Sequence, residues 1–114
     1  MNIVYGILYI FHSNLRVLKA MKVTVRYYGV IWEAINKRTE EIELSECSTI
    51  RDLMKHIVET ENPQLLEMIY DNQGRIRDFL AYVINGVDIR SLDGFNTMLK
   101  NEDVVLLSPP IGGG

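Results

Sequence analysis

Alternating polar and apolar residues mark two strands early in the chain. Residues 22–28 (KVTVRYY) and 40–44 (EEIEL) alternate with a period of two, which is typical of strands that bury one face. We expect the two strands to pair as an antiparallel hairpin, with a short helical turn over residues 30–36 between them.

The strongest helix signal follows the second strand. Apolar residues at positions 50, 53, 54, 57 and 58 fall on one face of a helix, which we expect to run to about Glu61. Thr49 and Asp52 have the spacing of a capping box at its start. Asn62-Pro63 then predicts a second, shorter helix that ends at Tyr70.

The rest of the chain predicts two or three further strands. Residues 79–84 (FLAYVI) and 87–89 flank Asn85-Gly86, which is the commonest signal for a two-residue hairpin turn. A loop that contains Gly94 follows. The apolar run 104–107 (VVLL) predicts a last strand that is covered on both faces or nearly so.

This order of elements favours an α+β fold of the ubiquitin-like β-grasp type. Strands from both ends of the chain must share one sheet if the apolar face of the helix is to pack across it. We expect a mixed sheet of four to five strands with one main helix, closed by a parallel pairing of residues 22–28 with 104–107. The β-grasp domain then occupies residues 21–108, and residues 109–114 form a projecting tail.

Residues 1–20 form an N-terminal extension that differs from the rest. They include Arg16 and Lys19 but no acidic residue, and residues 3–11 are almost wholly apolar. These nine residues are too few to cross a hydrocarbon core about 30 Å thick, and no basic residue precedes them as in a secretory signal. The segment is an added strand or arm, an interface segment, or translated sequence upstream of a start at Met21. We expect no membrane partner and a cytoplasmic location.

Composition excludes several classes of function. The chain has 114 residues, of which 47% are hydrophobic, so it builds one core but has little room for a large cofactor-binding enzyme. Its net charge of -3 argues against general nucleic-acid binding, which needs clustered Lys and Arg. The only cysteine is Cys47, and the two histidines, His12 and His56, are too few for a zinc site without carboxylates. We therefore expect no bound cofactor, no metal and no nucleic-acid partner.

The tail carries the chemistry that the rest of the chain lacks. Pro109 and Pro110 hold the chain extended, so that the six residues 109–114 reach roughly 20 Å. The closing glycines have no Cβ and leave the carboxylate of Gly114 unhindered. A carboxylate reacts with nucleophiles only after activation, for example as an acyl-adenylate, which sulfur converts to a thiocarboxylate and an amine to an amide. The sequence predicts a C-terminus that is offered to the active site of another enzyme.

Several stretches resemble the MoaD/ThiS family of ubiquitin-like sulfur carriers. They are similar to the family's opening strand, its helix start, its asparagine-glycine hairpin, its glycine-containing loop and its Pro-Pro-x-x-Gly-Gly ending. These features correspond to residues 25–29, 49–53, 83–89, 92–99 and 102–114. The resemblance covers residues 21–114 and is greatest to the molybdopterin synthase branch, because residues 62–78 form a longer segment than in the shortest thiamine-pathway carriers. Trp32 departs from the arginine that the family usually has near this position.

The resemblance implies that the chain is the non-catalytic small subunit of molybdopterin synthase. An E1-like adenylyltransferase would use ATP to activate Gly114, and a sulfur donor would convert it to a thiocarboxylate. The large subunit of the synthase would take up the tail in a hetero-oligomer and pass the sulfur to a pterin precursor of the molybdenum or tungsten cofactor. Gly113 and Gly114 are then the reactive positions. The candidate partner-binding residues are Leu92, Phe95, Pro109, Pro110, Ile111 and Gly112.

Other functions are compatible with the same tail. A ubiquitin-like modifier would be joined through Gly114 to lysine side chains of target proteins. A carrier for thiamine synthesis or tRNA thiolation would hand its sulfur to a different acceptor. A β-grasp interaction domain would have an inert tail, as glycine-rich ends often are.

Overall fold

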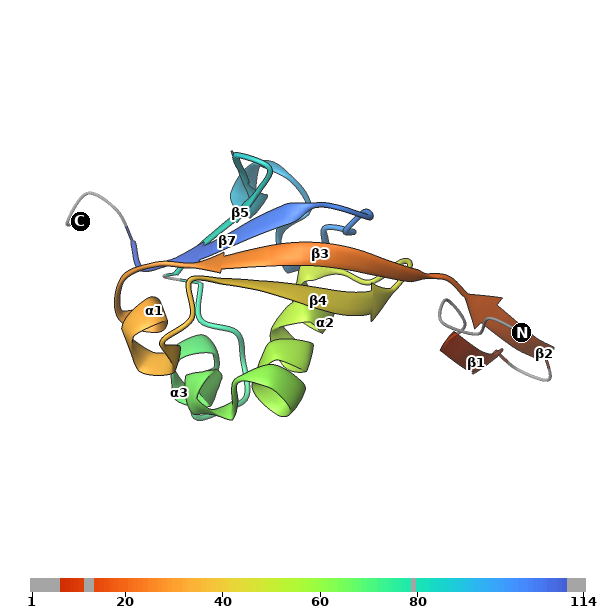
Figure 1. Cartoon of the computed structure of the whole chain (residues 1–114), viewed down its shortest axis with the longest axis horizontal. Helices are drawn as coiled ribbons and strands as arrows, with labels where there is room; N and C mark the ends of the chain where they lie inside the picture. The colour runs from red at the N-terminus through yellow and green to blue at the C-terminus, as the bar shows by residue number, and fades with distance from the viewer. Residues whose placement is uncertain (1–6, 12–13, 79, 111–114) are drawn as a thin grey trace.

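A five-stranded mixed sheet forms the frame of the molecule. The computed structural model describes residues 7–11, 14–78 and 80–110. The strand order is β4-β3-β7-β5-β6, with β3 and β7 parallel and the other neighbours antiparallel. The predicted β-grasp fold is thereby confirmed (Figure 1). The strands are β3 (Ala20–Tyr27), β4 (Thr39–Ser45), β5 (Ala81–Ile84), β6 (Val87–Asp88) and β7 (Val104–Ser108).

The main helix begins at the predicted capping box. The Asp52 N–H donates to Thr49 Oγ1 at 3.2 Å, and the Thr49 N–H donates to Asp52 Oδ2 at 2.9 Å. α2 (Ile50–His56) then continues as a π-helix through Glu61, so the predicted extent is confirmed although the winding changes. The shorter helix is a 3-10 turn (Pro63–Leu65) followed by α3 (Leu66–Ile69). Two further 3-10 turns, Ile89–Ser91 and Gly94–Asn96, lie between β6 and β7.

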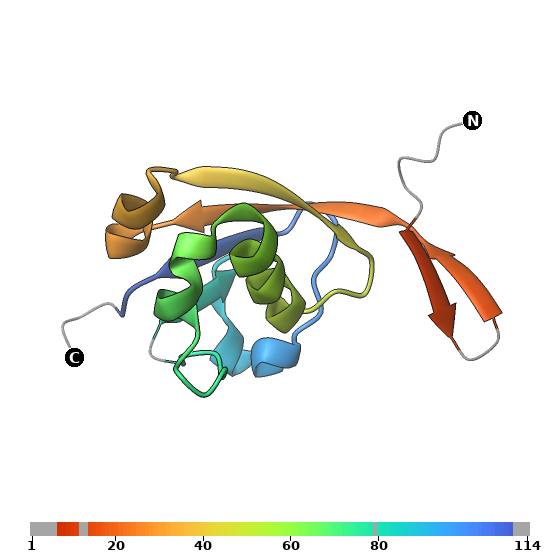
Figure 2. The ribbon, with the colours of Figure 1, turned by 90° about the horizontal axis from the view of Figure 1, so that it is seen from below.

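The core lies between α2 and one face of the sheet. Figures 1 and 2 show α1 (Gly29–Ile35), α2 and α3 on the same side of β3 and β4. Burying a Val, Ile, Leu or Met side chain contributes about 1.5–3 kcal/mol to folding. The residues with no exposed surface include Val23, Val25, Ile50, Leu53, Met54, Ile57, Val105 and Leu107.

The antiparallel pairing of β3 with β4 and the short helix between them, α1, agree with the sequence prediction. Two details of the sheet differ from it. β5 begins at Ala81, while Phe79 lies outside the described residues. β7 is central, as predicted, and buries Val105 and Leu107, but Val104 and Leu106 are only half-buried, so the cover is complete on one face alone. An apolar run alone does not distinguish a face that a helix covers from one that only neighbouring side chains shield.

The described part of the N-terminal extension forms a separate hairpin. β1 (Ile7–Phe11) and β2 (Asn14–Leu18) pair antiparallel and project beyond the start of β3 (Figure 1). This arrangement agrees with the interpretation as an added arm, while the domain boundary at residue 21 stays a prediction. Among the described residues, no helix has the length and apolar character needed to cross a membrane.

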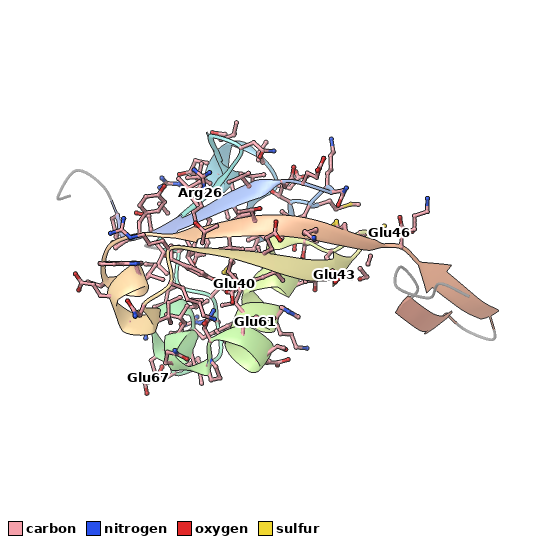
Figure 3. The ribbon with its side chains drawn as sticks, in the orientation of Figure 1. Arg26, Glu40, Glu43, Glu46, Glu61 and Glu67 are labelled. Carbon is pink, nitrogen blue, oxygen red and sulfur yellow. The ribbon has the colours of Figure 1, made fainter. Side chains whose placement is uncertain are left out.

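A polar network joins β3 and β4 to the end of the π-helix. The hydroxyl of Tyr27 donates to Glu40 Oε1 at 2.7 Å, and the Asn62 amide donates to the same oxygen at 2.9 Å. Lys37 Nζ donates to Glu40 Oε2 at 2.9 Å. Burial opposes ionisation of Glu40, but the hydrogen bonds from Tyr27, Lys37 and Asn62 and the charge of Lys37 outweigh it and lower the pKa of Glu40. The network therefore holds an ionised carboxylate (Figure 3).

We expect this network to make the fold sensitive to acid. Because the pKa of Glu40 is lowered on folding, its charge stabilises the fold above the usual glutamate pKa of about 4.3. This stabilisation is lost as the pH falls through the folded pKa. Glu40→Gln should cost about 1–3 kcal/mol at neutral pH and should show a smaller loss of melting temperature than wild type between about pH 5 and about pH 2. Thermal melts followed by circular dichroism across this range measure the difference.

Glu43→Gln serves as the matched control for this experiment. Glu43 lies on the same strand and is exposed, and its side chain makes no hydrogen bond or ion pair within the described part of the chain. Its melting curve should follow that of wild type at every pH. If acid lowered the melting temperature of Glu40→Gln as much as that of wild type, the acid sensitivity would not come from Glu40.

Candidate functional site

The tail leaves the domain from the middle of the sheet. Leu107, near the end of β7, lies opposite Tyr27 in the parallel pair and opposite Tyr82 in the antiparallel pair. Beyond the strand, Pro109 is half-buried and Pro110 is exposed. The predicted reactive residues Gly113 and Gly114 lie outside the described residues, as do Ile111 and Gly112, so their roles stay predictions.

Gly29 makes a close approach to the start of the tail. It follows β3 with a φ of +60°, and the Tyr28 N–H donates to the Leu107 carbonyl at 3.0 Å, which fixes this turn against the end of β7. A Cβ on Gly29 would lie 2.9 Å from Pro109 Cγ, which is closer than carbon atoms approach. The left-handed backbone and the close contact each require glycine. We call Tyr28, Gly29, Ser108 and Pro109 the tail root.

We expect Gly29→Ala to destabilise the protein more than the same change at Gly94. Gly94 has a φ of +59°, but apart from its neighbours in the chain no described residue comes within 4 Å of its Cβ position. Both substitutions place alanine in a left-handed conformation at a cost of about 1–2 kcal/mol, and only Gly29→Ala adds a clash, worth about 1–3 kcal/mol. Urea unfolding measures both free energies.

A second variant separates the clash from the backbone strain. Pro109→Ala removes the Cγ and Cδ atoms that the new Cβ would meet. In the Gly29→Ala background, Pro109→Ala should therefore restore most of the free energy of unfolding by which Gly29→Ala is less stable than Gly94→Ala. Equal losses in the two single variants would show that the Gly29–Pro109 contact is unimportant.

A row of half-buried apolar side chains continues from the tail root. Val83 on β5 lies opposite Leu106 on β7, and Leu106 lies opposite Arg26 on β3. Ala81 and Val104 are half-buried at the alternate positions of the same two strands. We call Ala81, Val83, Val104 and Leu106 the outer strip. Sequence reasoning missed it because the last strand was predicted to be covered, although the alternation with the buried residues Val105 and Leu107 defines this face.

Leu92 and Phe95, the two candidate partner-binding residues near Gly94, have different surroundings. Leu92 is 45% exposed between the two 3-10 turns. Phe95 is half-buried and packs edge-on against Tyr82, with ring centroids 5.0 Å apart. Since Tyr82 lies opposite Leu107, Phe95 supports the strand that carries the tail. The partner-binding role predicted for Leu92 and Phe95 stays a prediction.

The described residues present no cluster that could hold a metal ion. In residues 7–11, 14–78 and 80–110, no three His, Cys, Asp or Glu side chains gather into a possible metal site. Cys47 is exposed in the turn before α2. The geometry offers a firmly held tail root, a tail and an apolar strip beside it.

The fold and the glycine-ended tail define the chain as a ubiquitin-like β-grasp protein. A model of the ThiS family matches residues 25–114, so the chain belongs to the ThiS family, whose relatives are ubiquitin-like sulfur carriers and modifiers. The family resemblance predicted from the sequence is confirmed. The extension and the first residues of β3 precede the matched range.

Three relatives show the range of this similarity. Small archaeal modifier protein 3 of Haloferax volcanii is 23% identical over 94 residues, which are 82% of this chain and 100% of that protein. The crystal structure of SAMP1 from Haloferax volcanii has a TM-score of 0.72 at 19% identity, over 82% of this chain and 99% of that one. A chain in the complex of subunits 1 and 2 of molybdopterin-converting factor from Helicobacter pylori has a TM-score of 0.52 at 28% identity, over 82% of this chain and 100% of that one.

Proposed function

We propose that the chain is the sulfur-carrier small subunit of a molybdopterin synthase and acts through a thiocarboxylate on Gly114. The main support is the tail root, because it presents the start of a Pro-Pro tail with a glycine ending from a fixed point on a ThiS-family domain. The similarity to a chain from a two-subunit molybdopterin-converting factor also favours this function. The partners are then the large subunit of the synthase and an E1-like adenylyltransferase.

The chemistry requires only the terminal carbonyl of this chain. A carboxylate oxygen of Gly114 attacks the α-phosphorus of ATP, and pyrophosphate leaves. A sulfide equivalent attacks the acyl carbon of the adenylate, AMP leaves, and a thiocarboxylate remains. Its ionised sulfur is a soft nucleophile. The sulfur bonds to the pterin precursor in place of an oxygen substituent while it is still attached to the acyl carbon. Water then attacks that carbon, the C–S bond breaks, the sulfur stays on the precursor and Gly114 is again a carboxylate.

A protein modifier is the second candidate function. The similarity to small archaeal modifier protein 3 supports it. The same acyl-adenylate is then attacked by the amine of a target lysine, which forms an isopeptide bond and releases AMP. Sulfur transfer to a thiamine precursor or to tRNA differs from the leading proposal only in the acceptor.

We expect the purified chain to gain one sulfur in exchange for one oxygen at Gly114. The reaction contains the E1-like adenylyltransferase of the same genome, ATP and sulfide, and intact-mass spectrometry reads the product. Deleting Gly114 should abolish the gain but change the melting temperature by no more than about 1–2 °C, because a tail end contributes little to the core. Cys47→Ser should gain sulfur as wild type does. Sulfur found on Cys47, or none on wild type, would overturn the proposal.

The acceptor separates the carrier from the modifier. We expect the thiocarboxylate form, mixed with the large subunit of the synthase, to convert the pterin precursor into a dithiolene product that mass spectrometry detects. The modifier function predicts instead covalent conjugates on lysines of cell proteins, which disappear when Gly114 is deleted. Such conjugates without any dithiolene product would favour the modifier.

A further inference from the structure

A small cavity beside the tail root carries two arginines. It has a volume of about 270 Å³ and is formed where β3 and β4 meet the start of α1. Figure 3 shows Arg26 near the end of β3 from which the chain turns toward α1. We call this cavity the arginine pocket. Its lining residues are Arg26, Tyr27, Tyr28, Gly29, Trp32, Arg38 and Thr39.

Neither arginine of the pocket has an anionic partner within the part of the chain that is described. The guanidinium groups of Arg26 and Arg38 form no hydrogen bond or ion pair there, although Arg38 stacks on Trp32. Glu40, which follows Thr39 in β4, is already engaged by Lys37 and Tyr27. In a chain of net charge -3, two uncompensated guanidinium groups in one cavity form a local cationic site.

Trp32 holds Arg38 in a binding-ready position. The guanidinium carbon of Arg38 lies 4.5 Å from the centroid of the Trp32 ring, and Trp32 itself packs against the core. Stacking on an aromatic face restricts the side chain but leaves the N–H donors at the edge of the guanidinium plane free. A carboxylate fits such an edge with two parallel hydrogen bonds.

The position of the pocket couples it to the tail. Gly29 lines the pocket, and its Cβ position lies 2.9 Å from Pro109 Cγ. The six residues 109–114 reach roughly 20 Å. An enzyme that encloses the tail to its end therefore comes into contact with the tail root and the adjoining pocket.

We propose that the arginine pocket docks an acidic side chain of the adenylyltransferase that activates Gly114. This inference rests on the proposed function only in its first step, activation by ATP, which the carrier and the modifier share. Arg38, held by Trp32, binds the carboxylate, and Arg26 adds a second positive charge. The pocket thereby orients the domain while the tail enters the active site.

The kinetics of pyrophosphate release from ATP test the docking role. The E1-like adenylyltransferase of the same genome is assayed with saturating ATP and varied concentrations of the intact chain. Arg38→Glu should raise KM for the chain about tenfold, the loss of one charge-assisted pair, and leave kcat within about twofold of wild type. Arg38→Gln should raise KM less. The wild-type KM should rise with added salt more steeply than that of either variant.

Lys100→Glu is the matched control for net charge. Lys100 is exposed, and its loop contacts the opposite end of β3, where the Glu102 N–H donates to the Lys22 carbonyl. This variant should keep KM within about twofold of wild type. Melting temperatures of all variants check that they are folded.

The possible outcomes separate the pocket from the proposed function. An unchanged KM in Arg38→Glu, or an equal rise in Lys100→Glu, overturns the docking role while wild type is still activated. A fall in kcat at constant KM also overturns it, because the pocket then acts on the reaction and not on binding. Absence of any wild-type activation overturns both the docking role and the proposed function.

Discussion

The parallel pairing of β3 with β7 determines where the C-terminal tail begins. Residues Thr24–Tyr27 lie opposite residues Val104–Leu107, and β7 is bonded to β5 on its other side. A strand that is paired along both edges cannot shift without breaking two sets of backbone hydrogen bonds. The buried side chains of Val105 and Leu107 hold it against the core as well. The residue after the strand therefore starts from a fixed point.

The contacts of the tail root fix the point from which the tail, residues 109–114, begins. At the origin, Gly29 packs against Pro109, and the Tyr28 N–H donates to the Leu107 carbonyl. Tyr27, one residue earlier, is anchored by Glu40 and Asn62. A substitution as distant in sequence as Asn62 thus acts on the same end of β3 that supports the tail. Rigidity at this point lowers the entropy that is lost when a partner encloses the tail.

Local signals predicted most of the elements correctly. The capping box of Thr49 and Asp52 is present as predicted. Asn85 and Gly86 have φ values of 49° and 87°, as a two-residue turn with left-handed residues requires. In both cases a few neighbouring residues determine the conformation, so the sequence pattern is sufficient. The parallel closure was also predictable, because both end strands need the same helix face.

Features that depend on contacts distant in sequence were not predictable. The ring of Phe95 packs on Tyr82, which the sequence does not place beside it. Arg38 lies six positions after Trp32, in the link between α1 and β4, and the turn at Asn36, with a φ of 54°, brings the two side chains together. The half-buried face of β7 depends on the absence of a helix above it, which an apolar run does not reveal.

The outer strip and the arginine pocket adjoin each other at Arg26, and this limits how partners can bind. Arg26 lines the pocket and lies opposite Leu106 of the outer strip. A protein that covers the strip as far as the tail root therefore also covers Arg26. In the proposed function, one tail enters one active site at a time, so the activating enzyme would have to leave before the sulfur-accepting enzyme or a target binds. The adjoining surfaces would impose this order, because a partner docked at the tail root covers the position that the next partner needs.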